Sequence, residues 1–149
     1  MRDGLNTTIL DFATSLAQAQ GSKLHIVHAW DYRGADADTI RSESISEIRV
    51  RLFEKNEGAH RAWLQDYLDG YDLDEVDCHV HVLHGSAEHT LGGFVTEENI
   101  HLVVMETLRR AGIPGALIGS AAEYVLRRVN CSVLVKKPPG FQTPVGLNA

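Results

Sequence analysis

The stretch from Leu102 to Lys136 constrains the fold more than any other part of the sequence. It opens with the apolar run Leu102–Met105, which is too short for a helix, rich in β-branched side chains and typical of a buried parallel strand. Ser120, followed three residues later by Glu123, forms a capping box that predicts the start of a helix. A second strand is predicted over Cys131–Val135. Strand, loop, helix and strand make a βαβ unit, so we expect an α/β protein with a parallel sheet.

The loop and helix start within this unit form a candidate anion site. Open α/β sheets bind ligands at the carboxyl ends of their strands, which is where this loop begins. The first backbone N–H groups of the helix, at Ser120 and Ala121, carry the positive end of the helix dipole. Gly119 would let a phosphate approach the backbone closely. An ordinary capped helix after a turn explains the same residues equally well, so both interpretations stay open.

Residues 102–145 are similar to the C-terminal third of a universal stress protein domain, above all to the second half of the tandem, two-domain type. The similarity lies in the segments GIP, GSAAEYVL, CSVLV and KPPGF, followed by TPV. A weaker resemblance covers most of the chain. It implies an adenine-nucleotide alpha hydrolase-like fold, with helices on both faces of an open, mainly parallel sheet of order 3-2-1-4-5. It also implies a role in stress response, one domain over residues 1–137 and a Pro-rich tail over 138–149.

The nucleotide motif of this family is only partly present. Nucleotide-binding members carry G-x2-G-x9-G-[S/T] after a Met that ends the fourth strand. Met105 matches that Met, Glu106 and Arg109 stand at the first two glycine positions, and Gly119-Ser120 completes the motif. Glu106 adds bulk and negative charge where a polyphosphate would lie. The resemblance therefore implies a degenerate nucleotide site.

The arginines after Glu106 leave two alternatives open. Arg109 and Arg110 can bind phosphate in place of the lost glycines, or they can pair with Glu106 and close the site. The candidate remnant site consists of Met105, Arg109, Arg110, Gly112, Gly119, Ser120 and Ala121, with Glu106 opposing it. We expect no cofactor and a non-catalytic domain that acts through dimer or interdomain contacts. The alternative is a regulatory domain that binds ATP or AMP through Gly119-Ser120. The sequence has no G-x-S-x-G, H-E-x-x-H or Walker A motif, so we expect no enzyme.

The start of the chain departs from the family pattern. A helix capped within residues 6–8 and ended by Gly21 is predicted, with Phe12 among its inward residues, and a strand follows over Lys23–Trp30. These resemble the first helix and second strand of the family, so the first, central strand is missing. Two strands would then keep unpaired edges in the core. We expect an N-terminally truncated chain, or a strand supplied by another segment or subunit: a homodimer or the partner half of a tandem protein.

The middle of the chain predicts a long helix over residues 43–69, a strand over 75–83 and a helix ending before His101. Strict alternation in the strand places its valines inward, and His79 and His81 outward on a wet face. His79, His81 and His84 can share a metal, but no carboxylate or thiolate stands at a familiar ligand spacing. We expect solvated histidines and no metal. His60 is expected on a helix surface.

Composition sets the remaining bounds. The net charge of −6 disfavours nucleic acid and anionic membranes as partners, and leaves a small-molecule ligand possible. Cys78 and Cys131 lie in strand-like contexts and are expected to be free, buried thiols in a reducing compartment. There is neither a run of about 18 apolar residues nor a signal-peptide pattern, so we expect a cytoplasmic protein.

Overall fold

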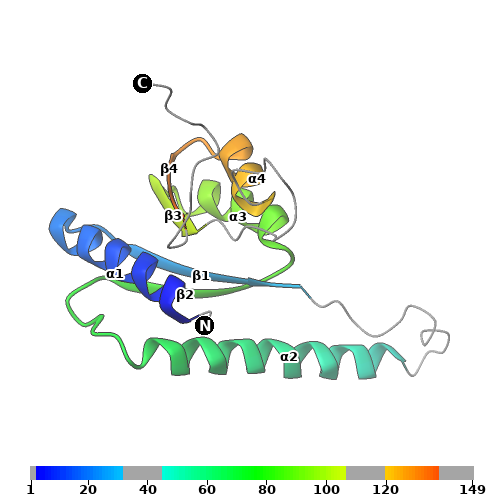
Figure 1. The fold of residues 1–149 in the computed structure, drawn as a ribbon. Helices are drawn as coiled ribbons and strands as arrows, with labels where there is room; N and C mark the ends of the chain where they lie inside the picture. Colours follow the sequence, from blue (N-terminus) through cyan, green and yellow to red (C-terminus); the bar gives the residue numbers. More distant parts are fainter. Residues whose placement is uncertain (1–2, 32–44, 107–119, 138–149) are drawn as a thin grey trace.

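The computed structural model describes residues 3–31, 45–106 and 120–137 of the 149-residue chain. Helices and strands alternate along it (Figure 1). In chain order they are α1 (Asp3–Gln20), β1 (Leu24–Trp30), α2 (Ile45–Leu68), β2 (Cys78–His84), α3 (Ala87–Glu97), β3 (Leu102–Glu106), α4 (Ser120–Arg128) and β4 (Ser132–Lys136). Every described strand pair is parallel, which confirms the predicted α/β class.

The strands form two separate sheets. β1 pairs with β2, with Leu24 opposite Cys78, and β3 pairs with β4, with Leu102 opposite Ser132. In the part of the chain that the structure describes, no strand joins β1 to β3. Figure 1 shows β3 and β4 running steeply across the direction of β1 and β2. Each sheet therefore has a free edge on the side of the other sheet.

Helices cover both faces of the β1–β2 sheet, which confirms the three-layer arrangement. On one face, Leu10 of α1 packs with Leu64 and Leu68 of α2, and the strand residues Ile26 and Val82 lie against this cluster. α3 lies on the other face, beside α4, β3 and β4 (Figure 1). α1 also contacts β3, so it spans the gap between the two sheets. No helix within the described ranges is long and apolar enough to cross a membrane.

The first helix is longer than predicted. It already runs from Asp3, so the predicted cap within residues 6–8 is wrong. Its predicted end is confirmed, because Gly21 adopts φ 59° and the N–H of Ser22 donates to the carbonyl of Ala17 at 3.0 Å. Phe12 was expected to point inward, but it is 47% exposed. The helix packs through a neighbouring stripe, and periodicity alone does not say where an apolar stripe ends.

The predicted wet face of β2 is confirmed for His79, whose side chain is 44% exposed, and wrong for His81. The strand begins at Cys78, and the ring of His81 packs edge-on against Phe94 of α3, with ring centroids 4.7 Å apart. Val80, on the supposedly buried face, is 39% exposed. His60, expected on a helix surface, instead stacks on the buried Trp30. Alternation separates the two faces of a strand, but it does not say which face a distant helix will cover.

Candidate functional site: the cavity between the two sheets

A cavity of about 760 Å³ lies between the free edges of β1 and β3. α1 closes one side with an apolar stripe, Ile9, Ala13, Leu16 and Ala17. α3 closes the opposite side with Leu91, Phe94 and Val95, of which the last two are buried. The stripes follow helical spacing, so both helices turn their apolar faces to the cavity. Its size falls within the usual range of ligand pockets.

All five residues of β3, Leu102–Glu106, line this cavity. Side chains alternate between the two faces of a strand, so a cavity that touches five consecutive residues must run along the strand's edge. On β1 the lining is shorter and consists of Leu24, His25 and Val27. The cavity therefore follows the whole edge of β3 and only the first half of β1.

Two backbone hydrogen bonds identify which backbone groups face the cavity. The carbonyl of His101 accepts from the N–H of Ser132 at 3.1 Å, so His101 directs its backbone toward β4. Because successive residues direct their N–H and C=O groups to alternate sides, Leu102, Val104 and Glu106 direct theirs toward the cavity. The same reasoning applies to β1, where the N–H of Leu24 donates to Asp77 at 2.9 Å. His25 and Val27 then face the cavity.

Glu106 places an unsatisfied carboxyl oxygen at the end of this cavity. Its Oε1 atom is buried and has no hydrogen-bond partner among the described residues. Burial raises the pKa of the Glu106 carboxyl, and the opposing attraction of Lys136, its register partner on β4, is the smaller effect. Glu106 therefore offers a hydrogen-bond acceptor that the described chain leaves unused.

The structure describes only part of the predicted remnant site. Met105 and Glu106 both line the cavity at the carboxyl end of β3. α4 begins at Ser120, as predicted, with Ala121 as its second residue, and the side chains of both are outside the description. Arg109, Arg110, Gly112 and Gly119 lie outside the described residues. Both alternatives for Arg109 and Arg110, phosphate binding or pairing with Glu106, therefore stay predictions.

Two histidine pairs on opposite faces of the β1–β2 sheet were not foreseen. Nδ1 of His25 lies 3.1 Å from Nε2 of His81, and Nε2 of His28 lies 3.0 Å from Nδ1 of His60. Burial, followed by the neighbouring histidines, lowers the pKa of His25, and burial and His60 lower the pKa of His28. Within the described ranges, no group of three or more potential ligands is arranged to hold a metal. The first pair depends on the parallel register of β1 and β2, and the second on the packing of α2 against β1, and local sequence spacing records neither.

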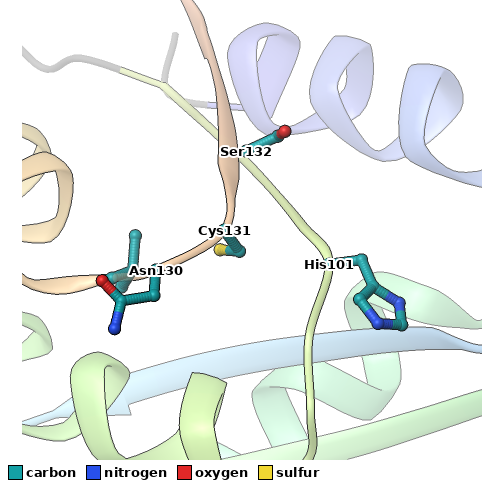
Figure 2. Close-up of a pocket in the computed structure, with 5 residues that line it drawn as sticks. His101, Asn130, Cys131 and Ser132 are labelled. Carbon is teal, nitrogen blue, oxygen red and sulfur yellow. The ribbon is translucent and has the colours of Figure 1, made fainter.

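A second hollow, of about 520 Å³, lies where β3 and β4 begin and is lined by His101 and residues 129–132 (Figure 2). It contains Cys131, which is free, as is Cys78. Burial raises the pKa of the Cys131 thiol above its usual value, and the ring of His101 points away from this thiol in Figure 2. The pair therefore lacks the geometry and the lowered pKa of a nucleophilic cysteine with its base.

The fold and its cavity define an α/β protein built from parallel strands, with helices on both faces and an open gap between two half-sheets. Residues 5–137 match the universal stress protein family, and the chain belongs to this family. The resemblance seen in the sequence is thereby confirmed. Its finer assignment to the second half of a tandem protein stays a prediction.

Relatives of known sequence carry the same family name. The chain is 30% identical over 88 residues to universal stress protein E of Photorhabdus laumondii, and 26% identical over 139 residues to a homolog of that protein in Haemophilus influenzae. These alignments cover 59% and 92% of the chain, but only 27% and 43% of those relatives. The chain thus spans less than half of the length of these relatives. Universal stress protein Sll1388 of Synechocystis is 25% identical and is covered to 91%.

Solved structures support the fold. The chain resembles a functionally unknown protein of Pseudomonas aeruginosa with a TM-score of 0.63 and 24% identity, covering 91% of this chain and 41% of that one. It resembles a universal stress protein of Lactobacillus plantarum with a TM-score of 0.64 and 14% identity, covering 87% of each chain. At this identity the likeness establishes the architecture alone. Family membership supports a role in the stress response.

Proposed function

We propose that this chain is a non-catalytic universal stress protein domain whose function depends on contact with another polypeptide. The observation that carries the proposal is the cavity between β1 and β3, which separates two half-sheets along their free edges. Buried backbone groups without partners cost free energy, so such edges favour contact with more polypeptide. The partner is a second copy of the chain or the other half of a tandem protein.

The carboxylate of Glu106 supports a degenerate nucleotide site. It stands at the carboxyl end of β3, where ligands of open α/β sheets bind, and one of its oxygens is buried without a partner in the described part of the chain. A polyphosphate brought there would meet a negative charge or would have to force protonation of the group. Charge repulsion and forced protonation both weaken nucleotide binding. We therefore propose that the domain works without a cofactor.

We further propose that the domain is non-catalytic and cytoplasmic. Cys131, which lines a hollow together with His101, is poorly suited to nucleophilic chemistry, and burial raises the pKa of the Cys78 thiol as well. We therefore place the domain outside enzyme catalysis. We also propose that it is cytoplasmic and part of a two-part protein. The second point is supported by relatives such as universal stress protein E, which are more than twice as long as the matched segment.

A regulatory domain that binds ATP or AMP is the second candidate. The start of α4 at Ser120 supports it, since a helix amino terminus favours anions. A related fold was solved as a universal stress protein in complex with cAMP. In this alternative, Gly119 and Ser120 hold the phosphate, and Arg109 or Arg110 compensates for Glu106.

The two candidates are separated by titrating Mg²⁺-ATP, and then AMP, into the protein in a calorimeter, while light scattering measures its mass. We expect no binding heat from the wild type. Micromolar binding, about −8 kcal/mol, would overturn the proposal in favour of the nucleotide-regulated domain.

Two double variants test whether the side chains of Glu106 and Arg109 block nucleotide binding. Replacing Glu106→Gly together with Arg109→Gly restores the glycine pattern, so we expect nucleotide affinity to rise. The control replaces Arg51→Gln and Glu54→Gln on the exposed surface of α2, which leaves the net charge equally unchanged. No gain in the first variant would show that these side chains do not block the site.

A further inference from the structure

We propose that His28 of β1 and His60 of α2 together bind one divalent transition-metal ion, with Cu²⁺ bound most tightly. Nε2 of His28 lies 3.0 Å from Nδ1 of His60, on the face of the β1–β2 sheet that α2 covers. Neither histidine lines the cavity between the two sheets. The inference therefore goes beyond the proposed function and does not depend on what occupies that cavity.

The separation of the two nitrogens suits two ligands of one metal ion. With metal–nitrogen bonds of about 2.0–2.1 Å, two nitrogens 3.0 Å apart subtend an angle of about 95° at the ion. This angle is close to that of the square-planar or tetragonal sites of Cu²⁺ and Ni²⁺, and smaller than the tetrahedral angle that Zn²⁺ prefers. The χ2 torsion of histidine is soft, so a rotation of each ring can turn both lone pairs toward the ion.

The pair is able to offer two lone pairs to a metal. Burial, followed by the neighbouring His60, lowers the pKa of His28, so this ring is neutral at about pH 7. In the metal-free pair, one ring donates its N–H to the other. The donating ring can carry its proton on its other nitrogen instead. A metal ion then replaces the hydrogen bond without net release of a proton.

A polar group beside the pair still lacks a partner. Trp30 is 4% exposed and stacks on His60, and its indole N–H is buried without a hydrogen-bond acceptor among the described residues. A water molecule bound to the metal would supply that acceptor. Trp63, which packs on His28, is 49% exposed, so an ion can reach the pair from this side. The unpartnered N–H is an observation independent of the histidines, and it indicates a polar ligand beside them.

The ion would keep water molecules as its remaining ligands. No group of three potential protein ligands is arranged to hold a metal in the ranges that the structure describes. Glu57, one turn before His60 on α2, pairs with Arg61 at 3.1 Å instead. Two protein ligands make an open site that exchanges its metal. Such a site follows the concentration of free metal and does not hold a permanent cofactor.

A metal at this position would connect two distant parts of the chain. His28 and His60 are 32 positions apart and belong to a strand and a helix. A shared ion would fasten the middle of α2 to β1, and a ligand that binds only the folded state raises its stability. The same separation explains why the sequence predicted no metal, since no local spacing connects the two residues.

Both tryptophans of the chain report on this site. The ring of Trp30 lies 4.9 Å from that of His60, the ring of Trp63 lies 5.2 Å from that of His28, and the sequence contains no other tryptophan. Bound Cu²⁺ quenches the fluorescence of an adjacent indole, whereas Zn²⁺, which has a filled d shell, does not. We expect one equivalent of Cu²⁺ to quench both tryptophans of the full, untagged chain. Zn²⁺ should raise the melting temperature without quenching.

Variants assign the binding to this pair. His28→Gln and His60→Gln each remove one ligand, and we expect each to weaken Cu²⁺ binding at least tenfold and to abolish the rise in melting temperature with Zn²⁺. The matched control, His81→Gln, removes a histidine from the pair on the opposite face of the sheet and should leave both signals as in the wild type. Because a substitution beside Trp30 can disturb packing, electron paramagnetic resonance of the wild type provides a second route. It should show Cu²⁺ coupled to two imidazole nitrogens.

Three outcomes would overturn the metal site. The first is equal quenching in the wild type, His28→Gln and His60→Gln. The second is loss of quenching in His81→Gln alone, because the ion would then lie on the opposite face of the sheet. The third is coupling of Cu²⁺ to fewer than two nitrogens. None of these measurements involves a nucleotide or a partner polypeptide, so the proposed function stands or falls separately.

Discussion

His25 on β1 and His81 on β2 form a hydrogen-bonded pair, with 3.1 Å between Nδ1 of the first and Nε2 of the second. Two neutral imidazoles make this bond when one ring donates and the other accepts. Phe94 packs against both rings, and His79 stacks on His25 at a centroid distance of 5.1 Å. Protonation of both rings would set two N–H donors against each other. The pair therefore couples the packing of α3 on the sheet to pH.

The first prediction follows from the direction of the pKa of His25. Burial first, then His81, His79 and Lys23, lower this pKa from its ordinary value of 6.5, and Glu98 only partly opposes them. The unfolded chain then binds the proton more tightly, so stability is present above about pH 6.5 and is lost as the pH falls through the folded-state pKa. Urea midpoints measured between about pH 8 and pH 5 should show this loss.

A variant checks the source of that pH dependence. His25→Phe removes the titrating ring and should flatten the fall in urea midpoint, although His28 still contributes. His89→Gln, at an exposed position of α3, should leave the curve as in the wild type. Equal curves for His25→Phe and the wild type would contradict the assignment.

The second prediction concerns the core between α1 and α2. Leu64 is 5% exposed and packs with Leu10 and Leu68. Leu64→Ala leaves a cavity there and should lower the free energy of unfolding by about 2–5 kcal/mol. Leu52→Ala on the same helix changes a side chain that is 39% exposed and should cost less than about 1 kcal/mol. Urea denaturation of the two variants measures the difference, and similar losses would argue against this core.

The third prediction concerns Gly85, between β2 and α3. Its φ is 124°, and a Cβ atom placed there would lie 2.8 Å from Cγ2 of Thr90. Gly85→Ala should cost more than Gly21→Ala, which has a positive φ but open space around it and should cost about 1–2 kcal/mol. Adding Thr90→Ser removes the clashing methyl group and should recover the part of the cost that this contact causes, while the strain of alanine at a φ of 124° remains. Thermal melts of the three variants test this order, and no recovery would leave the backbone as the sole cause.

The fourth prediction concerns Glu106. Burial raises the pKa of its carboxyl, so its contribution to stability is present at low pH and is lost as the pH rises through the folded-state pKa. Glu106→Gln removes the ionisation and should stabilise the protein near pH 7.5, with the gain disappearing toward about pH 4. Glu97→Gln, exposed at the end of α3, is the control. A loss of stability at pH 7.5 would mean that the attraction of Lys136 outweighs burial.

Local patterns predicted the elements well. The apolar run at Leu102, the capping box at Ser120 and the stop at Gly21 each correspond to an element or boundary in the structure. These signals depend on residues within a few positions of one another, so they act before the chain folds. The errors at Phe12 and at His81 of β2 concern which face a distant helix covers. That information is shared between segments far apart in the chain.

The sequence by itself determined the α/β class, the order of helices and strands, the family and the presence of Glu106 in place of a glycine. Each depends on residue types and on local spacing. Only the tertiary structure decided that the strands form two half-sheets around a cavity, that His25 meets His81, and that an oxygen of Glu106 is buried without a described partner. The physical reason is that strand pairing and burial are properties of segments brought together from distant positions, and no local pattern records them.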